Sequence, residues 1–307
     1  MSRTVSRDVP LAASRVLPGL QAEAAHALNA LMLMQQAGGK PLRHAELEPV
    51  RLAIAGMADY LSPVLGEDLD IGGVNSLGGY QYAHPAGVAA LSMAIGVCLG
   101  FEKGETGALG MSAVLMNIGY ALLRPSLLEQ SSQLEDDRWV EVKTHAAKSA
   151  EMLENCGLDA AVIAAIDHHH ERWDGSGYHQ GLAGRDIPRW ARIIGIADTY
   201  VSLRSPRPHR RAMGPRTATD FVISGCGVLF DPELVQVFAR RLPHLAIGSP
   251  IVLSSGEAGI VVNPNIGHVC RPIVRVSSMN GVALSDSYEI DMTDREQLSV
   301  VVREDSV

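Results

Sequence analysis

The segment that decides the fold runs from residue 166 to residue 179 and reads Ile-Asp-His-His-His-Glu-Arg-Trp-Asp-Gly-Ser-Gly-Tyr-His. His169 and His170 are adjacent imidazoles, and imidazole is the commonest side-chain metal ligand. Gly175 and Gly177 follow, and glycine lets the backbone turn sharply or approach a bound group closely. The segment therefore predicts a pair of metal ligands followed by a loop that contacts a substrate.

Further segments on both sides of this one occur in a fixed order, and the whole set resembles the HD-GYP family of bacterial proteins. The resemblance covers roughly residues 78–242. Active members of that family hydrolyse cyclic di-GMP with two or three metal ions, which an all-helical domain holds. The order of the matches is more specific than any single match. The further segments are Gly79–Ala89, Ala113–Tyr120, Lys143–His145, Ala191–Tyr200, Arg207–Arg210 and Phe230–Val235.

The hydrophobic pattern divides the chain into three regions, and the expected fold class is mainly α. We expect an N-terminal helical region at residues 1–68, an all-helical HD-type domain at residues 69–243 and a small β-rich domain at residues 244–307. In the last region short strands are predicted at 251–253, 259–262 and 273–276. Asn280-Gly281 is typical of a hairpin turn, so this region should form a small sheet or a partly open barrel. Helical breaks are predicted at Gly100, Gly157 and Gly214-Pro215.

The N-terminal region allows two interpretations. Its apolar residues lie near helical spacing, and a second helix is predicted from about 45 to 65. These helices would either form a homodimer or bind a signalling protein, or they would cap the main hydrophobic core. The residues at helical spacing are Leu17, Leu20, Ala24, Leu28 and Leu31.

The composition bears on which partners the protein binds and on where in the cell it is located. Charged residues make up 20% of the 307 residues and the net charge is −8, which argues against nucleic acid bound through bulk electrostatics. Four scattered cysteines without Cys-x-x-Cys spacing indicate a reducing cytoplasm. The N-terminus lacks the apolar core of a signal peptide. The apolar stretch Ala86–Leu99 is shorter than the roughly 20 residues that span a bilayer, so no membrane association is expected.

The resemblance implies seven metal-ligand positions, and five of them carry a suitable side chain. Met116 and Asn117 occupy the positions of the His-Asp pair, whose carboxylate bridges two metal ions in the family. A thioether is a poor ligand for hard divalent ions, and an amide has no charge. The five remaining candidates are His84, His145, His169, His170 and Asp198.

Charge balance argues against a binuclear centre. Two divalent ions carry four positive charges, and Asp198 is the only anion in the remaining set. In the family fold His145, His169 and His170 would face one metal position, and three imidazoles with an open fourth place are a known zinc arrangement. We therefore expect at most one divalent ion, whether zinc, iron or manganese.

The substrate-binding half of the family pattern is better preserved than the catalytic half. Tyr120 replaces the family's lysine three residues after the His-Asp pair, and His179 replaces the proline of the Gly-Tyr-Pro loop. Guanidinium groups suit phosphate oxygens because their N–H donors match the phosphate geometry. The residues that the resemblance assigns to the nucleotide are Gly175, Gly177, Tyr178, Arg207 and Arg210.

Four residues carry further expectations. Asp198 lies in an otherwise apolar helix, and a buried carboxylate needs a partner, for which Arg207 or a metal ion are the candidates. His168, beside the histidine pair, is expected to face solvent. Met116 and Tyr120 are expected to fill space that a metal ion would otherwise take.

Three functions remain open. The first is a catalytically impaired HD-GYP protein that acts in bacterial cyclic di-GMP signalling by binding the nucleotide or a partner protein. Met116-Asn117 favours this pseudoenzyme interpretation. The second is a metal-dependent phosphodiesterase that hydrolyses cyclic di-GMP or another phosphoester with a reduced metal site, which the histidines and Tyr178 favour. The third is a scaffold that binds no nucleotide.

Overall fold

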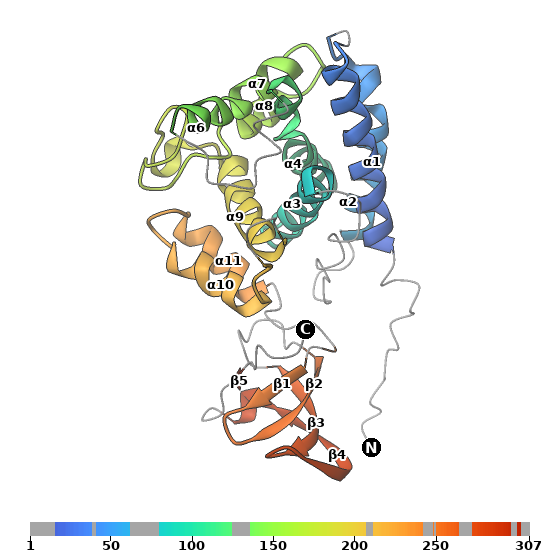
Figure 1. Ribbon diagram of the computed structural model, residues 1–307, viewed down its shortest axis with the longest axis vertical. Helices are drawn as coiled ribbons and strands as arrows, with labels where there is room; N and C mark the ends of the chain where they lie inside the picture. Colours follow the sequence, from blue (N-terminus) through green and yellow to red (C-terminus); the bar gives the residue numbers. More distant parts are fainter. Residues whose placement is uncertain are drawn as a thin grey trace.

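The computed structural model describes residues 16–38, 41–61, 80–124, 136–206, 211–241, 248, 250–263, 272–295 and 300–301. These residues form a helical body and a small antiparallel sheet near the C-terminus (Figure 1). Both predicted region boundaries, after residues 68 and 243, lie outside the described residues. The α-helices are α1 Val16–Gln36, α2 Glu48–Leu61, α3 Tyr80–Cys98, α4 Lys103–Leu115, α6 Asp136–Lys143, α7 His145–Leu153, α8 Ala160–Asp167, α9 Arg189–Arg204, α10 Pro215–Ser224 and α11 Pro232–Arg241.

One hydrophobic core joins the N-terminal helices to the rest of the helical body. Leu17, Ala24 and Leu28 are buried on α1, and they belong to the same cluster as the buried side chains of α3, α4 and α9. In Figure 1 α1 runs lengthwise beside this body, and it packs against α2 and α3. The packing supports the interpretation of α1 and α2 as a cap on the core, whereas homodimer formation stays a prediction.

The predicted helical breaks are confirmed, and each has a local cause. Gly100 and Gly157 follow α3 and α7 with φ angles of 83° and 70°, which glycine adopts without steric cost. Gly214 is the N-cap of α10 and Pro215 is its first residue, where the missing N–H of proline removes no helical hydrogen bond. None of the helices that the structure describes is long and apolar enough to cross a membrane.

The C-terminal sheet has the strand order β4-β3-β2-β1-β5, and all its pairings are antiparallel. Asn280 and Gly281 have φ angles of 49° and 83°, as a two-residue hairpin turn between β3 and β4 requires. Alternate residues such as Ile251, Val261 and Val274 face a separate small core. Among the described strands β4 and β5 form the two edges, so the tail is an open sheet. The strands are β1 Pro250–Leu253, β2 Glu257–Asn263, β3 Ile273–Met279, β4 Val282–Asp291 and β5 Val300–Val301, and the short helix η6 Met292–Asp294 follows β4.

Asp231 links α9 to α11. Its carboxylate accepts a hydrogen bond from Arg192 Nη1 at 2.5 Å and another from the backbone N–H of Glu233 at 2.8 Å. The Asp231 side chain is only 3% exposed, so the guanidinium supplies the charge partner that a buried carboxylate needs. Phe230–Val235 is one of the segments that carry the family resemblance, and Asp231 gives it a role in holding α11 against α9.

The short helix η4 (Ile118–Leu122) brings the end of α4 against α7. Gly119 donates its N–H to Ser149 Oγ at 2.8 Å, and that hydroxyl lies 2.8 Å from the carbonyl oxygens of both Met116 and His145. A Cβ atom on residue 119 would lie 2.3 Å from the carbonyl oxygen of His145. Glycine is therefore required here, and the contact fixes the position of Met116 relative to His145.

Gly119→Ala is expected to lower the free energy of unfolding by about 1–3 kcal/mol, because the backbone of α7 must move to admit the methyl group. Urea unfolding followed by circular dichroism measures this change. Gly107→Ala on α4 is the matched control, since a Cβ there meets nothing within 4 Å. Equal stability of the two variants would contradict the tight contact.

Candidate metal centre

Three histidines from two segments converge in the helical body. His145 is the first residue of α7, and His169 and His170 follow the end of α8. One ring nitrogen of each lies within 4.8 Å of the others, and His145 and His169 are fully buried. The Nε2 atoms of His145 and His170 are 3.2 Å apart. Ligands 2.0–2.1 Å from a tetrahedral zinc ion are separated by about 3.3 Å, so this spacing fits a shared ion.

Backbone carbonyl groups orient two of the three rings. His145 Nδ1 lies 2.8 Å from the Val142 carbonyl oxygen, and His169 Nδ1 lies 2.6 Å from that of Ile166. An Nδ1–H that donates to a carbonyl leaves the lone pair on Nε2, which is the tautomer that binds a metal. His169 Nε2 is buried and has no hydrogen-bond partner among the described residues. The three-histidine cluster therefore fits one divalent ion.

Burial keeps the cluster in the neutral form. It lowers the pKa of His145 to about 3, with His169 as a second cause, and it lowers the pKa of His169 as well. Burial and the neighbouring His169 put the pKa of His170 well below its usual value. Neutral imidazole is the form that donates electrons to a metal ion, so no proton must leave before binding at neutral pH.

His84 and Asp198 pair with each other. His84 Nε2 and Asp198 Oδ1 are 2.7 Å apart, and the side chains are 5% and 16% exposed. Burial alone would raise the pKa of Asp198, but the hydrogen bond and charge of His84 outweigh it and hold this pKa below its usual range. Asp198 was expected to find Arg207 or a metal ion. The structure gives it His84, while Arg207 lies outside the described residues, so a further partner for Asp198 stays a prediction. The five candidate ligands make two sets of contacts, a histidine triplet and an Asp-His pair, and the negative charge of Asp198 acts on all three histidines of the triplet.

The positions of the family's His-Asp pair carry an apolar and a neutral residue between α4 and η4. Met116, at the end of α4, is fully buried in the main core. Tyr120 stacks on His145 with ring centroids 4.2 Å apart and an angle of 12° between the rings. Asn117 Oδ1 is buried and has no hydrogen-bond partner among the described residues. That Met116 and Tyr120 take the space of a metal ion stays a prediction, and the Asn117 amide offers one neutral oxygen.

The loop with the predicted nucleotide contacts is tied to the histidine pair. Tyr178 donates its backbone N–H to the His170 carbonyl oxygen at 3.3 Å, and its ring stacks on His170 with centroids 4.7 Å apart. Burial, followed by the nearby Tyr120, raises the pKa of the Tyr178 phenol, so it stays a neutral donor. A Cβ on Gly177 would lie 2.4 Å from the backbone of Glu171, which explains the glycine.

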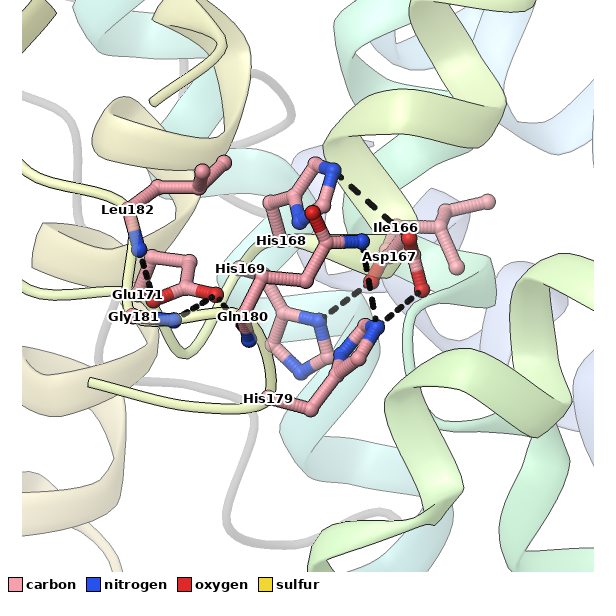
Figure 2. Close-up of polar contacts among 9 residues, drawn as sticks. All are labelled: Ile166, Asp167, His168, His169, Glu171, His179, Gln180, Gly181 and Leu182. Carbon is pink, nitrogen blue, oxygen red and sulfur yellow. Dashed lines mark hydrogen bonds and ion pairs between the residues drawn. The ribbon is translucent and has the colours of Figure 1, made fainter. Parts of the chain in front are cut away.

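Glu171 fixes this loop from inside, a role that the sequence analysis did not assign. Its carboxylate accepts three backbone N–H bonds, from Gln180 at 2.8 Å, Gly181 at 3.2 Å and Leu182 at 3.1 Å (Figure 2). The residue is 5% exposed, and these bonds stabilise its buried oxygens. A carboxylate directly before a glycine-rich loop is the sequence signal that could have indicated the role.

Asp167 holds the same loop from the other side. Its carboxylate oxygens lie 3.5 Å from His179 Nε2 and 3.6 Å from His168 Nε2, and Figure 2 shows both rings turned toward it. The His168 side chain is only 13% exposed, so the expectation that it faces solvent is wrong. It is covered because the His179 ring packs on it, with centroids 5.9 Å apart. Arg207 and Arg210, the other predicted nucleotide contacts, lie outside the described residues.

The buried histidines predict that acid destabilises the protein. Between about pH 6.5, where unfolded histidines gain protons, and about pH 3, the unfolded chain binds more protons than the folded chain. Stability should therefore fall with pH by up to about 1.4 kcal/mol per pH unit for each histidine. Urea unfolding of metal-free protein at about pH 7, 6 and 5 measures this slope. His145→Gln should flatten it, and an identical slope in that variant would contradict the assignment.

Comparison with known proteins agrees with this geometry. The HD domain family matches residues 73–234, which is more than half of the chain. A cyclic di-GMP phosphodiesterase of Pseudomonas aeruginosa is 29% identical over 198 residues, which cover 64% of this chain and 48% of that protein. The cyclic di-GMP phosphodiesterase response regulator RpfG of Xanthomonas campestris is 33% identical over 168 residues, covering 54% and 43%. The chain spans about half the length, or less, of these relatives.

A third relative and a solved structure complete the comparison. The 3'3'-cGAMP-specific phosphodiesterase 3 of Vibrio cholerae is 27% identical over 202 residues, covering 66% of this chain and 40% of that protein. The fold is similar to that of an HDGYP protein from Bdellovibrio bacteriovorus, with a TM-score of 0.53, 18% identity and coverage of 77% and 73%. Together with the segments around His169-His170, these matches show that the chain belongs to the HD-GYP group of the HD domain family.

Proposed function

We propose that this protein binds a cyclic dinucleotide at a site with one divalent metal ion and is impaired in hydrolysing it. The observation that carries the proposal is the division of the candidate ligands. His145, His169 and His170 form one neutral cluster, whereas Asp198 is held by His84 at 2.7 Å. The protein would then act in cyclic di-GMP signalling as a receptor.

Charge supports a single ion. The cluster's three rings are neutral, and Asn117 offers an uncharged oxygen at the position where the family has a bridging carboxylate. Two divalent ions would repel each other in this buried place without an anion between them. A bound ion would supply Lewis acidity toward a phosphate oxygen, and zinc, iron and manganese all suit imidazole ligands.

The nucleotide class is supported by the loop and by the relatives. Tyr178 presents a partly buried aromatic ring against His170, and aromatic faces stack on bases. The named relatives act on cyclic di-GMP or on 3'3'-cGAMP. Both ligands carry two phosphodiester groups. Arg207 and Arg210 are proposed to contact these phosphates.

Metal analysis and calorimetry test the proposal. Protein loaded with Zn²⁺ or Mn²⁺ should retain about one equivalent of metal. Titration with cyclic di-GMP and with 3'3'-cGAMP should give measurable heat for at least one of them. No linear dinucleotide or GMP should form above the rate without protein. Two retained equivalents, or no binding of either nucleotide, would refute it.

A working phosphodiesterase is the second candidate, and the histidine cluster favours it. Three imidazoles with an open fourth position are the ligand set of several catalytic zinc sites. The same assay separates the two candidates when Zn²⁺, Mn²⁺ and Fe²⁺ are each supplied. Turnover that disappears in a His169→Ala variant would establish the enzyme and overturn the impaired receptor.

A protein partner or a second copy of the chain would receive the signal through α1 and α2. Leu33 on α1 and Leu52 on α2 are 53% and 64% exposed, so these helices present apolar side chains outside the core. Light scattering with and without cyclic di-GMP measures the mass. A monomer under both conditions would remove the homodimer from the proposal.

A further inference from the structure

We infer that Lys143 binds a phosphate of the cyclic dinucleotide and supplies the positive charge that Tyr120 cannot provide. The inference deepens the proposed function and rests on it. Lys143 is the last residue of α6 and precedes His145 by two positions. Its Nζ atom lies 5.3 Å from the centroid of the Tyr178 ring, on the loop assigned to the nucleotide.

The arrangement puts Lys143 at the edge of the candidate metal centre. The Tyr178 ring contacts both Lys143 and the cluster. It stacks on His170 with ring centroids 4.7 Å apart, and the ammonium group of Lys143 lies near the same ring. The Tyr120 ring stacks on another member of the cluster, His145, with centroids 4.2 Å apart. Both tyrosines thus contact the histidines, and Lys143 provides a cation at Tyr178.

The charge of Lys143 is available to a ligand. Among the residues that the structure describes, no carboxylate lies within 4.0 Å of its ammonium group. By contrast Arg192 is held by Asp231, and Arg124 by Glu141. Contact with an aromatic face is compatible with phosphate binding, because a flexible four-carbon stem lets the ammonium group turn between the two.

Lys143 also compensates for the positive charge that is missing at Tyr120. The family resemblance assigns the position of Tyr120 to a phosphate-contacting lysine, and a phenol carries no positive charge. Without Lys143, a dinucleotide with two anionic phosphates would meet one divalent ion and the charge of Arg172, which acts on His170 and Tyr178. Lys143 restores one positive charge from a different helix, α6 instead of η4. We assign Lys143 a role in binding the cyclic dinucleotide and none in hydrolysing it.

Two substitutions at position 143 test the inference by calorimetry with cyclic di-GMP. Lys143→Met keeps an unbranched stem over Tyr178 and removes the charge, so the dissociation constant should rise about 10- to 100-fold. Lys143→Arg should bind within about 3-fold of wild type because the charge remains. The affinity of Lys143→Met should also depend less on salt concentration, a change that altered packing alone would not produce.

Lys103→Met is the matched control. It removes the same charge from the start of α4, where Lys103 pairs with Asp59 and is 58% exposed. Its affinity and salt dependence should equal those of wild type, and metal content should be unchanged in all three variants. If wild type binds and Lys143→Met binds equally well, the inference fails while the proposed function stands. If wild type binds neither cyclic di-GMP nor 3'3'-cGAMP, both fail.

Discussion

Replacing His169 with alanine is expected to abolish retained metal. His169 is fully buried, its Nδ1 is engaged by the Ile166 carbonyl and its Nε2 has no hydrogen-bond partner among the described residues. Removing it leaves two imidazoles, which are too few for a stable buried site. Mutating a group that only hydrogen-bonds to a metal ligand typically lowers metal affinity by about 10–100-fold. Loss of the ligand itself should therefore weaken metal binding by more than about 100-fold. Plasma emission analysis after dialysis measures the content.

The control for this prediction is another histidine outside the cluster. His26 lies exposed on α1, and His26→Ala should retain as much metal as wild type. Both variants should keep the helical circular dichroism spectrum. If His169→Ala retains metal at the wild-type level, the ion sits elsewhere and the three-histidine centre is wrong.

The double substitution Met116→His and Asn117→Asp is expected to raise retained metal from about one to about two equivalents. The new carboxylate would supply the bridging anion, and the new imidazole a further ligand. The backbone there is already fixed, because Ser149 Oγ contacts the carbonyl oxygen of Met116 and the N–H of Gly119. Hydrolysis of cyclic di-GMP should then become measurable, since two ions clamp the attacking and leaving oxygens of a displacement.

The single substitutions separate charge from ligand number. Asn117→Asp adds the anion alone and should restore part of the second equivalent, whereas Met116→His adds a neutral ring and should restore little. Each variant is compared with wild type by metal content and by linear dinucleotide formed. Unchanged stoichiometry in the double variant would mean that more than these two side chains separates this site from the binuclear one.

The expected results for His169→Ala and for the double substitution both depend on the charges at the metal site. In wild type, burial keeps the three imidazoles neutral, and the only nearby anion among the five candidate ligands, Asp198, pairs with His84. A second cation would therefore enter a buried place without a compensating charge. Met116, which replaces a ligand at this position, packs in the main hydrophobic core.

The sequence by itself determined the features that depend on neighbouring residues. Helical periodicity located α1 and α2, glycines at 100 and 157 marked helix ends, and Asn280-Gly281 marked the hairpin. The family pattern indicated the histidine triplet, and the structure places those three rings together. These features follow from local backbone preferences and from a motif in which order along the chain is preserved.

Only the tertiary structure decided which partners the polar groups have. His84 and Asp198 are 114 positions apart, and the family pattern put both in one set of metal ligands without predicting their direct contact at 2.7 Å. The partial burial of His168 beside His179 and the approach of Lys143 to Tyr178 likewise depend on how a loop folds back on a helix. The physical reason is that packing fixes such distances across the whole core, where a shift of one ångström changes a hydrogen bond into no contact.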